Sequence, residues 1–338
     1  MIVKRIIIFR ADGGHNIGMG HFIRSLALAE MLKDDFQCVC ATQNPSKYQI
    51  SEIERVCQSR MDLPEDDTHF NVFLNQLKGD EIVVLDNYFF TTDYQRSIKS
   101  KGCKLVCIDD LHDKEFVADL VINHTPGINP KDYKASSATQ FALGSSYALL
   151  RPEFLEQAKK SRAIESIENV MICFGGSDFN KITERTLKAI QQFIRIKNII
   201  VVTGSAYRPS SEFQSLLEND KRVSHRSELN SKEMLATMLE VDLAIVPASS
   251  IAFEAVCAGC KLLICKYAEN QKIFHQFLVD DLNTASFGDN SNTFQEHLFV
   301  EQLQKIIANP QNDKHHFLKE NIAKSDSNIL NLFLKLND

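Results

Sequence analysis

The sequence predicts an α/β protein of two Rossmann-like, doubly wound domains that face each other across a cleft. Short apolar runs alternate with helix-like segments, a pattern typical of a parallel sheet with helices on both faces. The alternation occurs in two series, separated by a charged, helix-like segment that begins near Pro152. One domain usually takes about 100 to 200 residues, which the length of 338 residues exceeds. We therefore expect an N-terminal domain over residues 1–155 and a C-terminal domain over residues 156–338 with a helical tail.

The first series contains five strand-like runs, at residues 6–9, 37–41, 82–85, 105–108 and 120–122. Ligands of doubly wound sheets bind beyond the carboxyl ends of the strands. The polar residues that follow these runs are Asp12, Asp86, Asn87, Tyr88, Asp109 and Asp110. The second series has runs at residues 169–174, 199–203, 222–225, 243–246 and 262–265, and helix-like segments fill residues 290–338.

A glycine-rich loop follows the first strand and carries Gly13, Gly14, Gly18 and Gly20 before His21. Glycines let the backbone approach a ligand closely, and the N–H groups at the start of the next helix suit a phosphate or a developing negative charge. The loop has neither the P-loop spacing nor G-x-G-x-x-G. The alternative is a simple sharp turn, with the histidine as a hydrogen-bonded surface group.

Two further turns in the second half precede helices. Residues 174–178 contain Gly175, Gly176, Ser177 and Asp178, and a helix is expected over residues 183–193. Residues 247–255 place Ser249 and Ser250 at a helix start, with Glu254 one helical turn after Ser250. Hydroxyl and N–H groups in such turns can donate to phosphate oxygens. The alternative is that Ser249 only caps the helix and Glu254 only complements its dipole.

Composition excludes several classes of function. A net charge of −6 offers no basic field for nucleic acid. No apolar stretch approaches the roughly 18 residues of a membrane span, and the N-terminus lacks a signal-peptide pattern. Nine scattered cysteines, an odd number, indicate reduced thiols in a cytoplasmic protein. The Cys257-x-x-Cys260 pair has no second pair with which to build a structural zinc site.

Taken together, the motifs resemble those of the UDP-2,4-diacetamido-2,4,6-trideoxy-β-L-altropyranose hydrolases of pseudaminic acid biosynthesis. The resemblance spans roughly residues 4–280 in the family's order. It rests on R-x-D…I-G-x-G-H from Arg10 to His21, Asp86-Asn87-Tyr88, Asp109-Asp110, YALLRPEF at 147–154, residues 174–178, Ala248-Ser249-Ser250 with Glu254-Ala255, and Glu269-Asn270-Gln271. Asn87 departs from the histidine of some relatives, and residues 12–16 depart from a usually serine-rich loop.

The resemblance implies the glycosyltransferase B fold, with the nucleotide mainly on the C-terminal domain, and no cofactor or metal. It implies that His21 is the general base and that Tyr88 and Asn270 line the sugar and water site. Glu254 would bind the ribose, while the diphosphate or uridine would be held by Ser249, Ser250, Gly175, Gly176, Ser177 and Asp178. The other expected substrate-binding residues, which match family positions, are Asp12, Gly18, Gly20, Arg151 and Gln271.

The implied reaction is inverting hydrolysis of a UDP-linked 2,4-diacetamido-2,4,6-trideoxy sugar to UDP and free sugar, for a surface glycan. Histidine has an ordinary pKa of about 6.5, which suits a general base at neutral pH. The alternatives are a glycosyltransferase that uses a UDP-sugar and a non-water acceptor, a sugar 2-epimerase of the same fold, and a nucleotide-sugar sensor without chemistry. An acidic run from Asp109 to Asp113 could hold Mg²⁺ or Mn²⁺ or could be only a polar loop.

Overall fold

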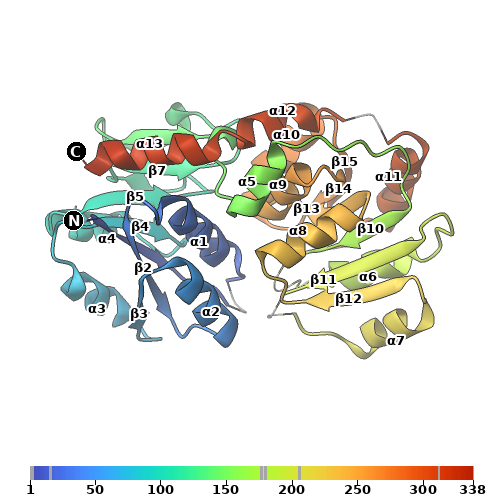
Figure 1. The fold of residues 1–338 in the computed structure, drawn as a ribbon, viewed down its shortest axis with the longest axis horizontal. Coiled ribbons are helices and arrows are strands. Elements are labelled where there is room, and N and C mark those ends of the chain that lie inside the picture. The colour runs from blue at the N-terminus through green and yellow to red at the C-terminus, as the bar shows by residue number, and fades with distance from the viewer. Residues whose placement is uncertain are drawn as a thin grey trace. The chain divides into compact units, whose positions relative to one another are not determined.

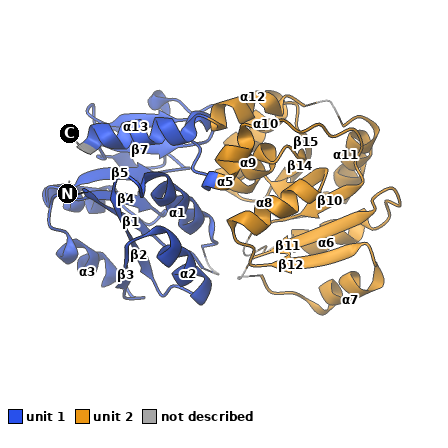
Figure 2. Ribbon diagram, viewed as in Figure 1, with its two compact units in different colours: residues 1–152, 324–338 blue, residues 153–323 orange. Residues whose placement is uncertain are grey.

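The computed structural model describes residues 4–14, 17–175, 178, 181–204, 207–310 and 313–337. It divides into two compact units, residues 1–152 with 324–338 and residues 153–323 (Figure 2). The expected boundary at residue 155 lies close to this division. The expected second domain, residues 156–338, differs at its end, because the last helix belongs to unit 1.

Unit 1 contains one large parallel sheet (Figure 1). Its strands, in spatial order, are β3 (Ser59–Leu63), β2 (Gln37–Gln43), β1 (Ile6–Ala11), β4 (Ile82–Asp86), β5 (Lys104–Ile108), β7 (Leu120–Asn123) and β9 (Gln140–Leu143). The central strand β1 is almost entirely buried, as its apolar sequence predicts. The short strands β6 (Glu115–Phe116) and β8 (Lys134–Ala135) pair separately.

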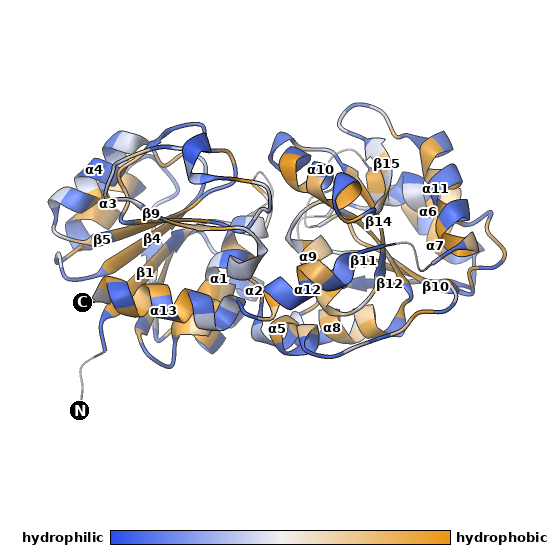
Figure 3. Cartoon of the chain, turned by 90° about the horizontal axis from the view of Figure 1, so that it is seen from above, coloured by the Kyte–Doolittle hydropathy of each residue, from blue (hydrophilic) through white to orange (hydrophobic). Residues whose placement is uncertain are grey.

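Helices cover both faces of this sheet. Figure 3 shows α1 (Gly20–Leu32), α2 (Lys47–Val56) and α13 (Ser325–Asn337) on one side and α3 (His69–Gln76) and α4 (Thr92–Ser100) on the other. The described part of the unit also contains the 3-10 turns η1 (Pro130–Asp132) and η2 (Ser145–Tyr147). The helix α13 returns to unit 1 because Ser325 bonds the backbone beside η2: its hydroxyl accepts from the Ala148 N–H at 3.0 Å and donates to the Ser145 carbonyl at 3.1 Å.

Unit 2 has a second parallel sheet. Its strands, in spatial order, are β12 (Val223–Ser227), β11 (Asn198–Thr203), β10 (Asn169–Ile172), β13 (Leu243–Pro247), β14 (Lys261–Lys266) and β15 (Ala285–Asp289). Its helical segments are α5 (Pro152–Ala158), α6 (Ile182–Ile190), α7 (Ser211–Asn219), α8 (Ser231–Glu240), α9 (Ser250–Cys257), η3 (Glu269–Gln271), α10 (Lys272–Asp280), α11 (Glu296–Ala308) and α12 (His315–Ile322). Numbered within the unit, the strand order is the 3-2-1-4-5-6 order of a Rossmann fold.

The prediction of two Rossmann-like, doubly wound domains is confirmed, and the cleft between them stays a prediction. Each sheet reverses its winding between its first and fourth strands, β1 and β4 in unit 1 and β10 and β13 in unit 2. Ligands of doubly wound sheets bind beyond the carboxyl ends of the strands at this switch point. In unit 1 these ends are Ala11 and Asp86, which are partners in the strand register.

Two other expectations concern the surroundings of the protein. The nine cysteines are buried free thiols, as their apolar sequence context predicts. Among the residues that the structure describes, no helix is both long enough and apolar enough to cross a membrane. The cytoplasmic location stays a prediction.

Candidate functional site

The glycine loop of unit 1 brings the start of α1 against the end of β1. Gly14 and Gly18 exchange two backbone hydrogen bonds, of 3.0 and 2.8 Å, which close the loop on itself. Gly18 has a φ of +75°, a conformation that favours glycine. A side chain at Gly13 would come within 2.8 Å of the Phe22 Cβ atom, so the loop packs closely on the first turn of α1. Gly20 is the first residue of that helix, and no side chain of the N-cap residue caps it.

His21 lies at the switch point and pairs with Asp86. The imidazole Nδ1 atom is 2.7 Å from Asp86 Oδ1, and both side chains are buried. The position of Asp86 at a strand end was predicted from the sequence, whereas its pairing with His21 was not. Among the described residues, the Nε2 atom of His21 has no hydrogen-bond partner.

Arg24 completes this arrangement from the next turn of α1. Its Nε and Nη2 atoms donate to the two oxygens of Asp86 at 2.7 and 2.6 Å, and Ser25 Oγ donates to Asp86 Oδ2 at 3.1 Å. Burial alone would raise the pKa of Asp86, but the charge of Arg24 and the hydrogen bonds from Arg24 and His21 outweigh it and hold this pKa below its usual value. An ionised carboxylate only accepts, so we assign the proton to Nδ1 of His21 and the lone pair to Nε2.

Tyr88 and Asp110 lie beside the group formed by His21, Asp86 and Arg24. The Tyr88 ring lies edge-on to the His21 ring, with centroids 4.5 Å apart, and 41% of Tyr88 is exposed. The Tyr88 hydroxyl donates to Asp110 Oδ2 at 3.0 Å, and Arg24 Nη1 donates to Asp110 Oδ1 at 2.6 Å. Against the effect of burial, Arg24 lowers the pKa of Asp110 to about 2. An exposed phenol ring therefore adjoins a buried, pre-oriented imidazole.

Asp12 lies at the end of β1 and is largely engaged with neighbouring strands. Its Oδ1 atom accepts from Arg10 at 2.6 Å, from the Thr42 hydroxyl at 3.1 Å and from the Gln43 N–H at 2.8 Å. Its backbone N–H donates to the Asn87 side chain at 2.8 Å, so the residue that departs from the family pattern holds this loop. Within the described part of the chain, Asp12 Oδ2 is buried without a hydrogen-bond partner. Substrate binding by Asp12 stays a prediction.

The acidic run after β5 is occupied by protein contacts. Asp109 accepts from the His112 N–H at 2.8 Å, while Asp110 is held by Arg24 and Tyr88. These contacts agree with the polar-loop interpretation. The described residues include no group of three or more His, Cys, Asp or Glu side chains suited to hold a metal ion. Metal independence stays a prediction, to be tested by chelation.

In unit 2, the turn after β10 begins with Gly175, whose φ of +81° requires the freedom of glycine. Gly176 and Ser177 lie outside the described residues. Asp178 caps α6: its two carboxylate oxygens accept from the N–H groups of Ile182 and Thr183 at 2.9 and 2.7 Å. This gives Asp178 a structural role that the sequence analysis did not anticipate, and substrate binding by it stays a prediction.

The turn after β13, the neighbouring strand, starts α9. Ser249 occupies the N-cap position, but its side chain makes no capping hydrogen bond. The interpretation of Ser249 as a simple helix cap therefore explains its position but gives its hydroxyl no role. Ser250 is the first residue of α9 and is partly exposed, and Glu254 is buried in the same helix. These residues share one edge of the sheet with Gly175, because β10 and β13 are parallel neighbours.

The remaining predicted residues are Gln271 and Asn270 in unit 2 and Arg151 in unit 1. Gln271 is buried, and its side-chain oxygen accepts from the Tyr267 N–H at 2.8 Å. The Tyr267 hydroxyl donates to the Phe174 carbonyl at 3.0 Å, which ties the end of β14 to the turn at Gly175. Asn270 is exposed in η3. Arg151 is buried at the end of the first segment of unit 1.

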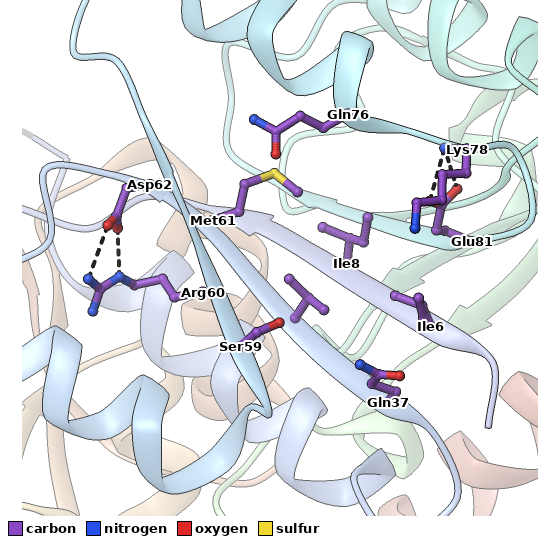
Figure 4. Close-up of a pocket in the computed structure, with 11 residues that line it drawn as sticks. Ile6, Ile8, Gln37, Ser59, Arg60, Met61, Asp62, Gln76, Lys78 and Glu81 are labelled. Atoms are coloured by element: carbon purple, nitrogen blue, oxygen red, sulfur yellow. Dashed lines mark hydrogen bonds and ion pairs between the residues drawn. The ribbon is translucent and has the colours of Figure 1, made fainter. Parts of the chain in front are cut away.

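A cavity of about 340 Å³ lies elsewhere in unit 1. Figure 4 shows its lining, which includes Ile6, Gln37, Ser59 and Glu81. These four residues begin or immediately precede β1, β2, β3 and β4, whereas Asp12 and Asp86 lie at the opposite ends of β1 and β4. The cavity therefore does not belong to the candidate site.

Comparisons with known proteins show a glycosyltransferase B-type fold. The structure of MurG from Acinetobacter baumannii matches with a TM-score of 0.61 at 14% identity, over 98% of this chain and 99% of that protein. No protein-family model matches the chain. The chain is 25% identical over 270 residues to the UDP-2,4-diacetamido-2,4,6-trideoxy-β-L-altropyranose hydrolase of Campylobacter jejuni, which covers 79% of this chain and 93% of the relative. The predicted resemblance to that hydrolase is thus confirmed.

A second relative is the spore coat polysaccharide biosynthesis protein SpsG of Bacillus subtilis. It is 25% identical over 304 residues, covering 88% of each chain. Two relatives that match most of this chain therefore have names that refer to sugar or polysaccharide metabolism.

Proposed function

We propose that this chain is an enzyme that acts on UDP-sugars and that it hydrolyses a UDP-linked 2,4-diacetamido-2,4,6-trideoxy sugar to UDP and free sugar. The observation that carries the proposal is the His21–Asp86 pair at the switch point of unit 1, beside the exposed ring of Tyr88. The named activity of the Campylobacter jejuni relative supports the substrate class. The product would enter the biosynthesis of a surface glycan, with pseudaminic acid as the specific proposal.

The His21–Asp86 pair has the geometry of a general base. Nδ1 donates to Asp86, so the Nε2 lone pair can accept a proton from water as the water oxygen attacks the anomeric carbon. The bond between that carbon and the phosphate oxygen breaks, and UDP leaves with the bonding electrons. Attack opposite the leaving group inverts the configuration, and Asp86 stabilises the imidazolium that forms.

Unit 2 would bind the nucleotide in this proposal. UDP is a good leaving group, so its departure needs stabilisation of the negative charge on its diphosphate more than protonation. The α9 N-terminus at Ser249 and Ser250 can provide it through its N–H groups and hydroxyls. Gly175 would allow close approach of the neighbouring turn, and Glu254 would contact the ribose.

The direct test supplies UDP-2,4-diacetamido-2,4,6-trideoxy-β-L-altropyranose to the purified protein without an acceptor. We expect equal amounts of UDP and free sugar, with the inverted anomer appearing first in ¹H NMR spectra, and an unchanged rate in excess EDTA. His21→Asn should lower kcat by about 10²- to 10⁴-fold and leave UDP affinity unchanged. His297→Asn, at an exposed histidine of α11, is the matched control.

Three outcomes would count against the proposal. Near-native turnover by the His21→Asn variant would show that His21 is not the general base. Release of UDP only after an alcohol is added would identify a glycosyltransferase. Inversion at the sugar C2 position without loss of UDP would identify an epimerase.

A further inference from the structure

One guanidinium in unit 1 holds two buried carboxylates that come from different strands. Arg24 gives two N–H groups to Asp86, at the end of β4, and a third to Asp110, after β5. The side chains of Arg24, Asp86 and Asp110 are 7%, 0% and 10% exposed. Each carboxylate also accepts a hydrogen bond from a different ring, Asp86 from His21 and Asp110 from Tyr88.

We propose that Arg24 is a positioning residue that sets both rings: it fixes Asp86 as the acceptor for His21 and holds Asp110 beneath the Tyr88 hydroxyl. This inference rests on the proposed function of His21 as the base. Arg24 does not need to touch the substrate, because it acts through the two carboxylates. Its planar fork suits the task, since lysine lacks the fixed geometry for bidentate pairing.

The charges around the imidazole explain why a cation is required. The imidazole contacts Arg24 from α1 and the side chains of Asp86 and Tyr88 at the end of β4. Asp110, after β5, lies close to it. His124, after β7, lies close to Arg24, Asp86 and Asp110. Burial and Arg24 lower the pKa of His124 to about 4, so it carries no charge at neutral pH. The two carboxylates and Arg24 therefore sum to one negative charge, and without Arg24 they would sum to two.

Loss of Arg24 would take away the cation that keeps Asp86 ionised. The charge and hydrogen bonds of Arg24 hold the pKa of Asp86 below its usual value, whereas burial alone would raise it. A protonated Asp86 would donate to Nδ1 of His21, so the imidazole hydrogen would lie on Nε2. An imidazole with hydrogen on Nε2 cannot act as the base.

The test is NMR spectroscopy at pH 8 of the full-length protein with ¹⁵N-labelled histidine. The His21 signals are assigned by their absence from the His21→Asn spectrum. In the unmodified protein we expect the tautomer with hydrogen on Nδ1. In Arg24→Gln we expect hydrogen on Nε2 and a kcat lowered by about 10²- to 10⁴-fold, because the base is blocked. Arg24→Lys keeps the positive charge, so it should keep the Nδ1–H tautomer but lower kcat, because lysine lacks the bidentate fork.

The matched control is Arg55→Gln, because Arg55 also grips a carboxylate, that of Glu30, in the same unit, at 39% side-chain exposure. It should leave the His21 tautomer and the rate unchanged. Arg24→Gln leaves two buried carboxylates without a cation and so risks misfolding. Arg24→Lys keeps the positive charge and is the variant that tests the inference if Arg24→Gln does not fold. The double variant Arg24→Gln/Asp110→Asn restores one net negative charge around the imidazole, so its loss of kcat should be smaller than that of Arg24→Gln.

Hydrogen on Nδ1 in folded Arg24→Gln, an unchanged kcat in Arg24→Lys, or the Nε2–H tautomer in the unmodified protein would overturn the inference. The NMR measurement needs no substrate, so it separates this inference from the proposed function. Absence of UDP-sugar hydrolysis with the predicted change of tautomer would refute the function alone, and hydrolysis without that change would refute the role of Arg24 alone.

Discussion

Replacing Asp86 with asparagine perturbs the candidate site with almost no change of shape. The carboxylate is fully buried and accepts from four donors: His21 and one Arg24 nitrogen on Oδ1, and another Arg24 nitrogen and Ser25 on Oδ2. An amide keeps one acceptor and gains two donors. In either orientation its NH₂ group opposes an Arg24 N–H, and no carboxylate remains to stabilise the imidazolium.

The magnitude follows from these contacts. Breaking a buried ion pair typically costs about 3 to 5 kcal/mol, and Asp110 still pairs with Arg24 in this variant. We therefore expect the free energy of unfolding to fall by about 3 kcal/mol. When the amide NH₂ faces His21 Nδ1, the imidazole carries hydrogen on Nε2 and cannot act as the base. We expect kcat to fall by about 10²- to 10⁴-fold.

The assay combines urea unfolding, UDP release from the proposed substrate and calorimetric measurement of UDP affinity. UDP affinity should stay unchanged, because the proposed nucleotide contacts belong to unit 2. A kcat within a few-fold of the unmodified protein, in a folded Asp86→Asn variant, would refute the base mechanism.

Three further predictions concern other residues. Burial lowers the pKa of His315 to about 4, whereas an unfolded histidine has a pKa of about 6.5. The free energy of unfolding should therefore fall as the pH falls from about 6.5 to about 4, by about 2 kcal/mol at pH 5. His315→Gln should remove that loss in urea titrations at pH 7 and pH 5, and an unchanged pH dependence would contradict the assignment. Gly175→Ala should lower the free energy of unfolding by about 1 to 2 kcal/mol in thermal unfolding, because the φ of Gly175 is +81°. It should also weaken UDP binding, because the proposed nucleotide approaches this turn closely, and an unchanged free energy of unfolding would refute the role of Gly175. Asp178→Ala should cost about 1 kcal/mol through loss of the α6 cap, and equal unfolding midpoints would exclude that role.

The interior of each sheet could be predicted from the sequence because parallel strands buried on both faces are nearly continuous apolar runs. The edge strands β3, β9 and β15 were missed because their sequences, SRMDL, QFAL and ASFGD, are short and mix polar and apolar residues. The destination of α13 depended on tertiary contacts such as those of Ser325, which no periodicity encodes.

For the candidate site, the sequence indicated His21, Tyr88 and the strand-end position of Asp86. The pairing of Asp86 with His21 depends on β4 lying beside β1, a strand order that no local pattern specifies. Arg24 was missed because a charged helix residue usually faces solvent. Its spacing of three residues from His21 places both on one helical face, and that was the available signal.

The central claim is that water, activated by the imidazole, displaces UDP at the anomeric carbon. Hydrolysis in H₂¹⁸O followed by mass spectrometry of both products tests it most directly. The account predicts one ¹⁸O atom in the free sugar and none in UDP. Incorporation of ¹⁸O into UDP would show that a phosphorus–oxygen bond breaks instead and would contradict the mechanism.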